Sequence, residues 1–173
     1  MLEPQQYSEL IDSALAEDIG LGDVTTAATV PRDVEGRAHV VTREDVVVAG
    51  IDLFTAVFHR VDESIELAPK ATDGDHRSAG DIIVELSGPL ASILIGERVA
   101  LNFFQRLCGI ATLTARYVSE LIPGSATKVV DTRKTTPLLR ALERHAVRCG
   151  GGFNHRPRLD GGVLIKDNHI ASC

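Results

Sequence analysis

Short apolar runs alternate with helical segments in the second part of the chain, and this rhythm constrains the fold more than any other feature. Residues 128–131 and 163–165 have the length and apolar character of short strands, and residues 138–146 between them carry apolar side chains at helical spacing. Short buried strands separated by helices are typical of parallel β/α units. We therefore expect this part of the chain to form α/β structure.

The first part of the chain shows a different pattern, in which helices and strands do not alternate strictly. We expect helices over residues 5–19 and 53–61, strands within residues 35–49, 65–67 and 81–86, and loops over residues 22–26 and 70–80. A turn at residues 87–89 should open a long helical segment, which Gly109 interrupts before a second helix over residues 111–122. The mixture predicts an α+β domain. Because aromatic residues make up only 4% of the chain, the core should be aliphatic.

Basic charge is concentrated in the second part of the chain. Residues 1–97 contain 19 acidic and 6 basic side chains, a net charge of -13, whereas residues 98–173 contain 5 acidic and 12 basic side chains, a net charge of +7. A local cationic field of this kind suits an anionic ligand. The alternatives are a solvated basic face or a nucleic-acid surface. The scarcity of aromatic residues that could stack on bases argues against nucleic acid.

The sequence disfavours several other classes of protein. No run approaches the roughly 18 apolar residues that a membrane helix needs, so we expect no membrane association. The N-terminus carries Glu3 and Glu9 instead of basic residues, which is unlike a signal peptide. The three cysteines, Cys108, Cys149 and Cys173, lack the spacing of a metal site, so we expect no metal centre there. They are interpreted as buried thiols in a reducing cytoplasm.

Thr132, Arg133 and Lys134 directly follow the first apolar run of the second part. Ligands in parallel β/α folds sit at the carboxyl ends of strands. A hydroxyl, a guanidinium fork and a point charge at such an end suit carboxylate and phosphate oxygens. The alternative is a solvated loop that carries two surface cations.

A second candidate site is the glycine-rich segment at residues 150–156. Its three glycines would let backbone N–H groups approach a ligand, and His155 and Arg156 would add a proton-sharing donor and an anion binder. Taken alone, a triple glycine is more often a flexible loop. The Asn-His-Arg sequence that follows it favours a site.

Lys166 follows the second apolar run and is a further candidate anion contact. We expect its neighbours Asp167 and His169 to be structural. Arg98 lies in the long helical segment beside Glu97, where a surface ion pair of little energetic value is the usual interpretation.

Longer strings of residues resemble the quinolinate phosphoribosyltransferase family. The resemblance lies in residues 17–20, 22–25, 97–107, 131–137, 150–156 and 164–170. It implies an α/β fold with an α+β N-terminal part. Residues 1–109 would form a sandwich domain with a linking helix. Residues 110–173 would form the first units of a type II phosphoribosyltransferase α/β barrel.

The resemblance also implies an activity. Phosphoribosyl pyrophosphate, bound with Mg²⁺, would react with quinolinate to give nicotinate mononucleotide, CO₂ and pyrophosphate in NAD biosynthesis. A homodimer or higher oligomer would share its active sites between subunits. Positions carried over from the family to the substrate pocket are Arg98 of the neighbouring subunit, Thr132, Arg133, Lys134, His155, Arg156 and Lys166.

The family resemblance assigns roles to these side chains. Arg133, Arg156 and the neighbouring subunit's Arg98 would clamp the two carboxylates of quinolinate. Lys134 and Lys166 would act in catalysis by neutralising carboxylate and phosphate charge. The histidine of the glycine-rich segment would orient the pyridine ring. The hypothesis depends on the convergence of these cations on one pocket.

The length of the second part leads us to expect an incomplete barrel. An eight-unit barrel takes about 250 residues and a β/α/β unit about 30, so residues 113–173 have room for about two units. The family's later acids, which face ribose and Mg²⁺, would lie beyond Cys173, and the 173-residue chain alone should be inactive or poorly soluble. Leu138, where the family pattern has Gly, and Pro157-Arg158 are smaller departures.

Two other hypotheses remain open at this stage. One is a related enzyme of the same fold with a different substrate, although paired carboxylate clamps favour quinolinate. The other is a truncated, non-catalytic protein that binds dicarboxylates or pairs with a full-length subunit.

Overall fold

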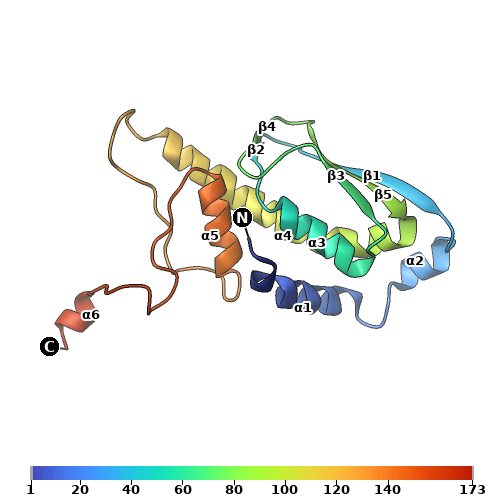
Figure 1. The fold of residues 1–173 in the computed structure, drawn as a ribbon, viewed down its shortest axis with the longest axis horizontal. Coiled ribbons are helices and arrows are strands. Elements are labelled where there is room, and N and C mark those ends of the chain that lie inside the picture. Colours follow the sequence, from blue (N-terminus) through green and yellow to red (C-terminus); the bar gives the residue numbers. More distant parts are fainter. Residues whose placement is uncertain (1, 173) are drawn as a thin grey trace.

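The computed structural model describes residues 2–172 and places a small antiparallel sheet over a pair of helices (Figure 1). The sheet has the strand order β1-β5-β3, formed by β1 (Glu35–Val41), β5 (Ile82–Pro89) and β3 (Glu66–Pro69). A separate two-stranded pair joins β2 (Val46–Val47) to β4 (His76–Arg77). Strand β2 lies where we expected strands, whereas β4 lies in the segment 70–80 that we expected to be loop.

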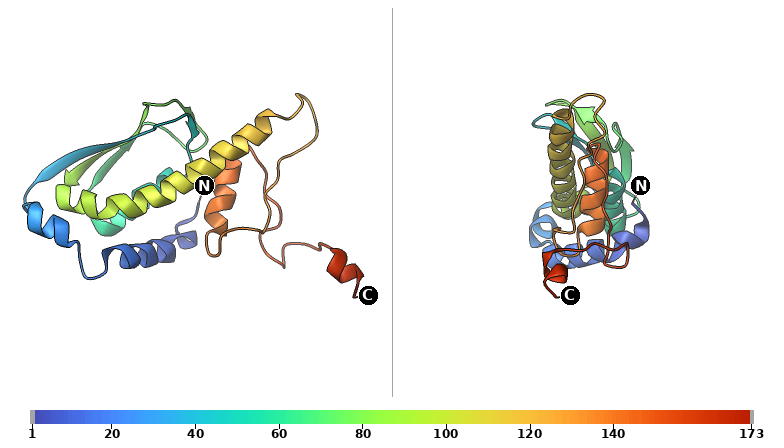
Figure 2. Two further views of the ribbon diagram at one scale, coloured as in Figure 1. Left: turned by 180° about the vertical axis from the view of Figure 1, so that it is seen from behind. Right: turned by 90° about the vertical axis from the view of Figure 1, so that its left-hand side faces the viewer.

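The helices α3 (Ile51–Val61) and α4 (Leu90–Ser119) lie between this sheet and α1 (Ser8–Ile19), as Figures 1 and 2 show. A single 3-10 turn, η1 (Pro4–Gln6), precedes α1. The expected α+β pattern is therefore present in the first part of the chain. No helix among the described residues has the combination of length and hydropathy that crossing a membrane requires.

The short helix α2 (Val24–Thr29) lies where we expected a loop, so that prediction was wrong. Asp23 is the reason, because its side chain accepts hydrogen bonds from the backbone N–H groups of Thr25 and Thr26, both at 3.0 Å. An aspartate at the N-cap satisfies donors that would otherwise be unpaired at the start of a helix.

The core between sheet and helices is mainly aliphatic but has an aromatic centre. Phe54 contacts Phe58 and Phe104, with ring centroids 5.1 and 5.3 Å apart. All three rings are at most 5% exposed. The expectation of an aliphatic core was therefore incomplete, because three of the seven aromatic residues gather at one place.

The helix α4 is continuous over 30 residues and passes straight through Gly109, so the predicted interruption was wrong. A helical glycine costs only about 1 kcal/mol relative to alanine. Leu107, Cys108 and Ala111 on either side are all buried, and their packing outweighs that cost. The boundary that we placed between residues 109 and 110 falls inside this helix.

The second part of the chain is more open than expected. Helix α5 (Arg140–Cys149) packs against α4, close to the predicted range. The predicted strand at residues 128–131 is reduced to one parallel bridge between Val130 and Phe153. Residues 163–165 form no strand, because no backbone partner lies beside them among the described residues. They belong to an extended segment that ends in α6 (Asp167–Ile170), apart from the body of the protein (Figures 1 and 2).

Gly150, at the end of α5, sets how closely that helix approaches α4. A Cβ atom there would come within 2.3 Å of the carbonyl oxygen of Ala111, whereas a Cβ at Gly109 would meet nothing within 4 Å. We predict that Gly150→Ala lowers the free energy of unfolding by about 1–3 kcal/mol through overpacking. Gly109→Ala should raise it by about 0.5–1 kcal/mol, because alanine is the better helix former.

Urea unfolding of the two variants beside the parent chain measures both effects. Equal stability of the two variants would contradict the packing that we describe here.

Candidate functional site

Two loops leave the same edge of the second part of the chain. The N–H of Phe153 donates to the carbonyl of Val129 at 2.9 Å, and the N–H of Asp131 donates to the carbonyl of Phe153 at 3.0 Å. The two segments run parallel, so the loops that follow them emerge side by side. We call these the 131–136 loop and the 154–156 loop.

The carboxylate of Asp131 ties the two loops together. It accepts hydrogen bonds from the side-chain amide of Asn154 at 2.6 Å and from the backbone N–H of His155 at 2.7 Å. It also pairs with Arg144 at 3.2 Å, and the two charged side chains are only 5% and 13% exposed. A buried carboxylate is stable only with such partners, so this group fixes the relative position of the loops.

Arginines of α5 add further links to both loops. Arg140 donates to the hydroxyl of Thr135 at 3.0 Å and to the carbonyl of Pro157 at 3.1 Å. Arg144 donates to the carbonyl of His155 at 2.6 Å. These arginines lie four residues apart on one face of the helix, which is the spacing of side chains that point the same way.

Glu143 holds the far end of the 131–136 loop. Its carboxylate accepts the backbone N–H of Thr136 at 3.2 Å and pairs with Arg106 of α4. Burial raises the pKa of Glu143, but hydrogen bonds from Arg106 and Thr136 outweigh that effect and leave the pKa below its ordinary value. Leu138, just after the loop, adopts a positive φ of 68°, a conformation suited to the Gly of the family pattern.

Three of the candidate residues, Thr132, Arg133 and Lys134, lie in the 131–136 loop. The hydroxyl of Thr132 accepts the N–H of Lys134 at 3.0 Å, which closes a tight turn. Arg133 is half-buried, and its Nε atom is buried without a hydrogen-bond partner among the described residues.

His155 and Arg156 lie in the 154–156 loop. The Nδ1 atom of His155 accepts the N–H of Arg156 at 2.8 Å. Arg156 is half-buried and donates from Nη1 to the carbonyl of Leu159 at 3.3 Å and to that of Gly162. Its Nε atom, like that of Arg133, is buried without a partner in the described part of the chain. The structure thus gathers these two arginines on adjacent loops.

Lys166 is not brought to this pair. It is exposed in the extended segment, and the backbone N–H of Lys166 donates to Nδ1 of His169 at 3.0 Å. That contact agrees with a structural role for His169.

Arg98 is also distant from the two loops along the fold. It lies on α4, exposed, in a groove of about 1050 Å³ whose lining includes β1 and none of the loop residues. Within residues 2–172 it makes no ion pair with Glu97. The structure therefore carries Arg133 and Arg156 on adjacent loops and Lys166 and Arg98 elsewhere, and the convergence of these cations on one pocket stays a prediction.

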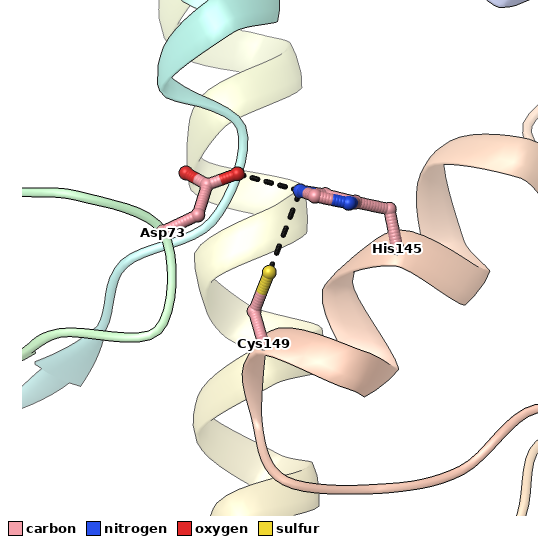
Figure 3. A group of neighbouring side chains, drawn as sticks. All are labelled: Asp73, His145 and Cys149. Carbon is pink, nitrogen blue, oxygen red and sulfur yellow. Dashed lines mark hydrogen bonds and ion pairs between the residues drawn. The ribbon is translucent and has the colours of Figure 1, made fainter. Parts of the chain in front are cut away.

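A buried group that the sequence did not suggest joins the N-terminal sandwich to α5. Figure 3 shows Asp73, His145 and Cys149, whose potential metal-ligand atoms lie within 4.8 Å of one another. Among the described residues, this is the one cluster of three such side chains. His145 Nε2 lies 2.5 Å from the Asp73 carboxylate and 3.4 Å from the Cys149 sulfur.

The hydrogen bond from Arg148 opposes a metal ion at this group. Arg148 donates to Nδ1 of His145 at 3.2 Å, and arginine is only a donor, so the proton of a neutral ring must sit on Nε2. A metal-binding histidine almost always has the reverse arrangement, with its second nitrogen donating to an acceptor. Burial raises the pKa of Cys149 to about 11, so the thiol is protonated in the metal-free group.

The two cysteines among the described residues were expected to be buried thiols. Cys108 is buried, and burial raises its pKa to about 12, so it is an unreactive thiol. Cys149 is only half-buried and contacts a histidine. Cys173 lies outside the described residues.

The residues that organise the site were missed because their roles depend on distant partners. Asp131 lies in the segment 131–137 that resembles the family, but we expected no role in the site for it. We also expected none for Arg106, Arg140, Glu143 and Arg144. The one available signal was the pair of arginines at positions i and i+4 of the predicted helix.

The Asp131–Arg144 pair can be tested by removing its negative charge. We predict that Asp131→Asn lowers the free energy of unfolding by about 3 kcal/mol, because it leaves the Arg144 guanidinium buried and unpaired. Asp160→Asn is the matched control, since Asp160 and Arg158 form an ion pair that is 70% and 77% exposed. That change should cost less than about 1 kcal/mol. Equal losses in urea unfolding would refute the organising role of Asp131.

Glu143 should make stability depend on acid. Because its folded pKa lies below the ordinary value, its ionised form adds stability above the unfolded pKa of about 4.3. That contribution is lost as the pH falls through the lower folded pKa. We therefore expect the stability difference between the parent chain and Glu143→Gln to shrink below about pH 4.3. A difference that stays constant from neutral pH into acid contradicts this assignment.

Comparison with known proteins gives one consistent family. Residues 23–108 match the family model "Quinolinate phosphoribosyl transferase, N-terminal domain", and residues 110–173 match "Quinolinate phosphoribosyl transferase, C-terminal domain". A probable nicotinate-nucleotide pyrophosphorylase [carboxylating] from Bacillus subtilis is 44% identical over 97% of this chain and 57% of its own length. A quinolinate phosphoribosyltransferase [decarboxylating] from Nicotiana tabacum is 45% identical over 95% of this chain and 46% of its own.

Solved structures agree with the sequence comparisons. NadC from Streptococcus pyogenes superimposes with a TM-score of 0.95 at 42% identity, covering 99% of this chain and 61% of that one. The nicotinate-nucleotide pyrophosphorylase from Francisella tularensis gives a TM-score of 0.93 at 40% identity, covering 99% of this chain and 61% of that one. The chain spans about half the length of the curated relatives it matches. The α/β fold with a partial domain is confirmed, and the chain belongs to the quinolinate phosphoribosyltransferase family.

Proposed function

We propose that the protein transfers phosphoribosyl from phosphoribosyl pyrophosphate to quinolinate with decarboxylation. The products are nicotinate mononucleotide, CO₂ and pyrophosphate, in the route to NAD. The observation that carries this proposal is the buried Asp131 carboxylate, which holds two cationic loops on one edge of the fold. Family membership supplies the substrate class.

The two loops suit the chemistry of quinolinate. This ligand carries two adjacent carboxylates, and planar guanidinium forks bind carboxylates through paired hydrogen bonds. Arg133 and Arg156 therefore act as clamps. Lys134 supplies a further positive charge, Thr132 lines the pocket, and His155 orients the pyridine ring.

The reaction needs positioning and charge stabilisation more than a protein nucleophile. The pyridine nitrogen attacks the ribose carbon as pyrophosphate departs, and the ring becomes cationic. The positive ring then stabilises the electron pair that stays on the ring carbon as CO₂ departs, and that carbon takes up a proton from water. Lys134 acts here as a cation that neutralises carboxylate and phosphate charge, and Lys166 would join it only if the exposed segment that carries it moved towards the two loops.

Mg²⁺ is expected to arrive with phosphoribosyl pyrophosphate, whose negative charge it would neutralise. The acids of the two loops do not suit it as ligands. Asp131 is fully engaged by Arg144 and the 154–156 loop, and Glu143 is engaged by Arg106 and Thr136. We therefore assign no Mg²⁺ ligand within the 131–156 region.

The proposed assembly is a homodimer or higher oligomer with shared active sites. Arg98 supports this, because its groove on the sandwich is separate from the loops of its own chain. A neighbouring subunit could then receive Arg98 as a third carboxylate clamp. The proposed location is the cytoplasm, which suits the free thiols of Cys108 and Cys149.

Quinolinate binding tests the site. The purified chain should bind quinolinate more tightly than nicotinate, which lacks one carboxylate. Arg133→Lys should weaken quinolinate binding roughly tenfold, because lysine cannot form the paired contact. Arg158→Lys, at an exposed arginine with a surface partner, is the matched control and should leave affinity unchanged. Isothermal titration calorimetry reports both values.

Turnover separates the proposed enzyme from a second candidate. Pyrophosphate release from quinolinate and phosphoribosyl pyrophosphate with Mg²⁺ supports the transferase. Binding without release supports a non-catalytic dicarboxylate-binding protein. Equal affinity for quinolinate and nicotinate would overturn both.

A further inference from the structure

A chain of hydrogen bonds connects the N-terminal sandwich to the candidate site. It starts at Asp73, whose Oδ1 atom accepts the N–H groups of Gly50 and Ile51 at 2.8 and 3.0 Å, at the start of α3. The other oxygen of Asp73 accepts from Nε2 of His145 at 2.5 Å, across to α5. Burial raises the pKa of Asp73, but the hydrogen bonds from His145 and from the backbone lower it by more. The pKa therefore lies below its ordinary value, and the carboxylate stays ionised.

The chain continues from His145 to the two loops. Arg148 donates from Nη2 to His145 Nδ1 at 3.2 Å and from Nη1 to the Asn154 side-chain oxygen at 2.6 Å. The amide nitrogen of Asn154 then donates to Asp131 at 2.6 Å. Every donor in this sequence meets an acceptor. Arg148 donates in both directions, so the hydrogen bonds point from it towards Asp73 on one side and towards Asp131 on the other.

His145 can complete this path in only one protonation state. The guanidinium of Arg148 requires a lone pair on Nδ1, and the carboxylate of Asp73 requires a proton on Nε2. A doubly protonated ring would direct Nδ1–H at a cation. The side chain is 7% exposed, so water cannot replace a lost partner easily.

We propose that His145 is a positioning residue for the candidate site. It sets Arg148, which sets Asn154, which sets the carboxylate of Asp131 between the two loops. The sandwich domain thereby contributes to the geometry of Arg133 and Arg156 without touching the ligand. This inference rests on the proposed function for the identity of the ligand, but not for the path of hydrogen bonds.

The experiment compares His145→Leu with His145→Gln in the full chain. Leucine fills a similar volume without polar atoms, whereas glutamine keeps one donor and one acceptor. His76→Leu is the control, because His76 is exposed on β4. Arg148→Ala interrupts the same path at an exposed side chain and serves if the leucine variant does not fold.

Three measurements are made, the first on the parent chain and the other two on the parent chain and each folded variant. The ¹⁵N shifts of the parent histidine should report a proton on Nε2 of His145 and none on Nδ1. Hydrogen exchange of the His155 amide, which donates to Asp131, should accelerate roughly tenfold in His145→Leu and Arg148→Ala. The quinolinate dissociation constant should rise by roughly the same factor, and glutamine should restore both values toward those of the parent.

Each result has a defined meaning. Faster exchange at His155 with rescue by glutamine supports the proposal even if the parent chain binds no quinolinate, in which case the proposed function alone fails. An unchanged His155 exchange rate in a folded His145→Leu protein overturns it. Stoichiometric Zn²⁺ binding that Cys149→Ser abolishes would also overturn it, because the metal would need the Nε2 lone pair.

Discussion

The buried ion pair between Asp131 and Arg144 is the interaction on which the candidate site depends. Its desolvation is costly, and the cost is offset only because Asn154 and the backbone of His155 satisfy the remaining lone pairs of the carboxylate. The same bonds that make the pair tolerable also join the two loops. Stability and site geometry therefore share one set of contacts, and neither can be changed alone.

The sandwich domain provides the rigid support behind this pair. Helix α4 runs from the sheet to α5 without a break, and Gly150 allows α5 to approach it closely. Glu143 and Arg106 then fasten the 131–136 loop to both helices. The loops are short of regular secondary structure, but each is held from a packed helix, which is how a loop can keep a defined geometry.

Local signals explain what the sequence could predict. The apolar spacing of α3 follows from burial on one face, and this helix was expected close to its observed bounds. The strand β5 was also expected, but it ends three residues later than predicted and buries the consecutive residues Ile83 and Val84. Predictions failed where a distant partner decides the outcome. Gly109 predicts a break in the helix, yet burial of its neighbours on α4 keeps the helix intact. Residues 163–165 have the pattern of a strand but no strand partner in the described structure. The path through His145 joins residues 72 positions apart, which no local pattern encodes.

Two guanidinium nitrogen atoms of the candidate site bear on its affinity for an anion. Nε of Arg133 and Nε of Arg156 are buried without partners among the described residues, and a buried donor left unsatisfied costs about 1–3 kcal/mol. Arg156 is held by its bonds to the carbonyls of Leu159 and Gly162, and the loop that carries Arg133 is held by Asp131, Arg140 and Glu143. An incoming carboxylate would supply the missing acceptors. Binding would then recover energy already spent in folding, which is why preorganised cations favour an anion more than flexible surface cations do.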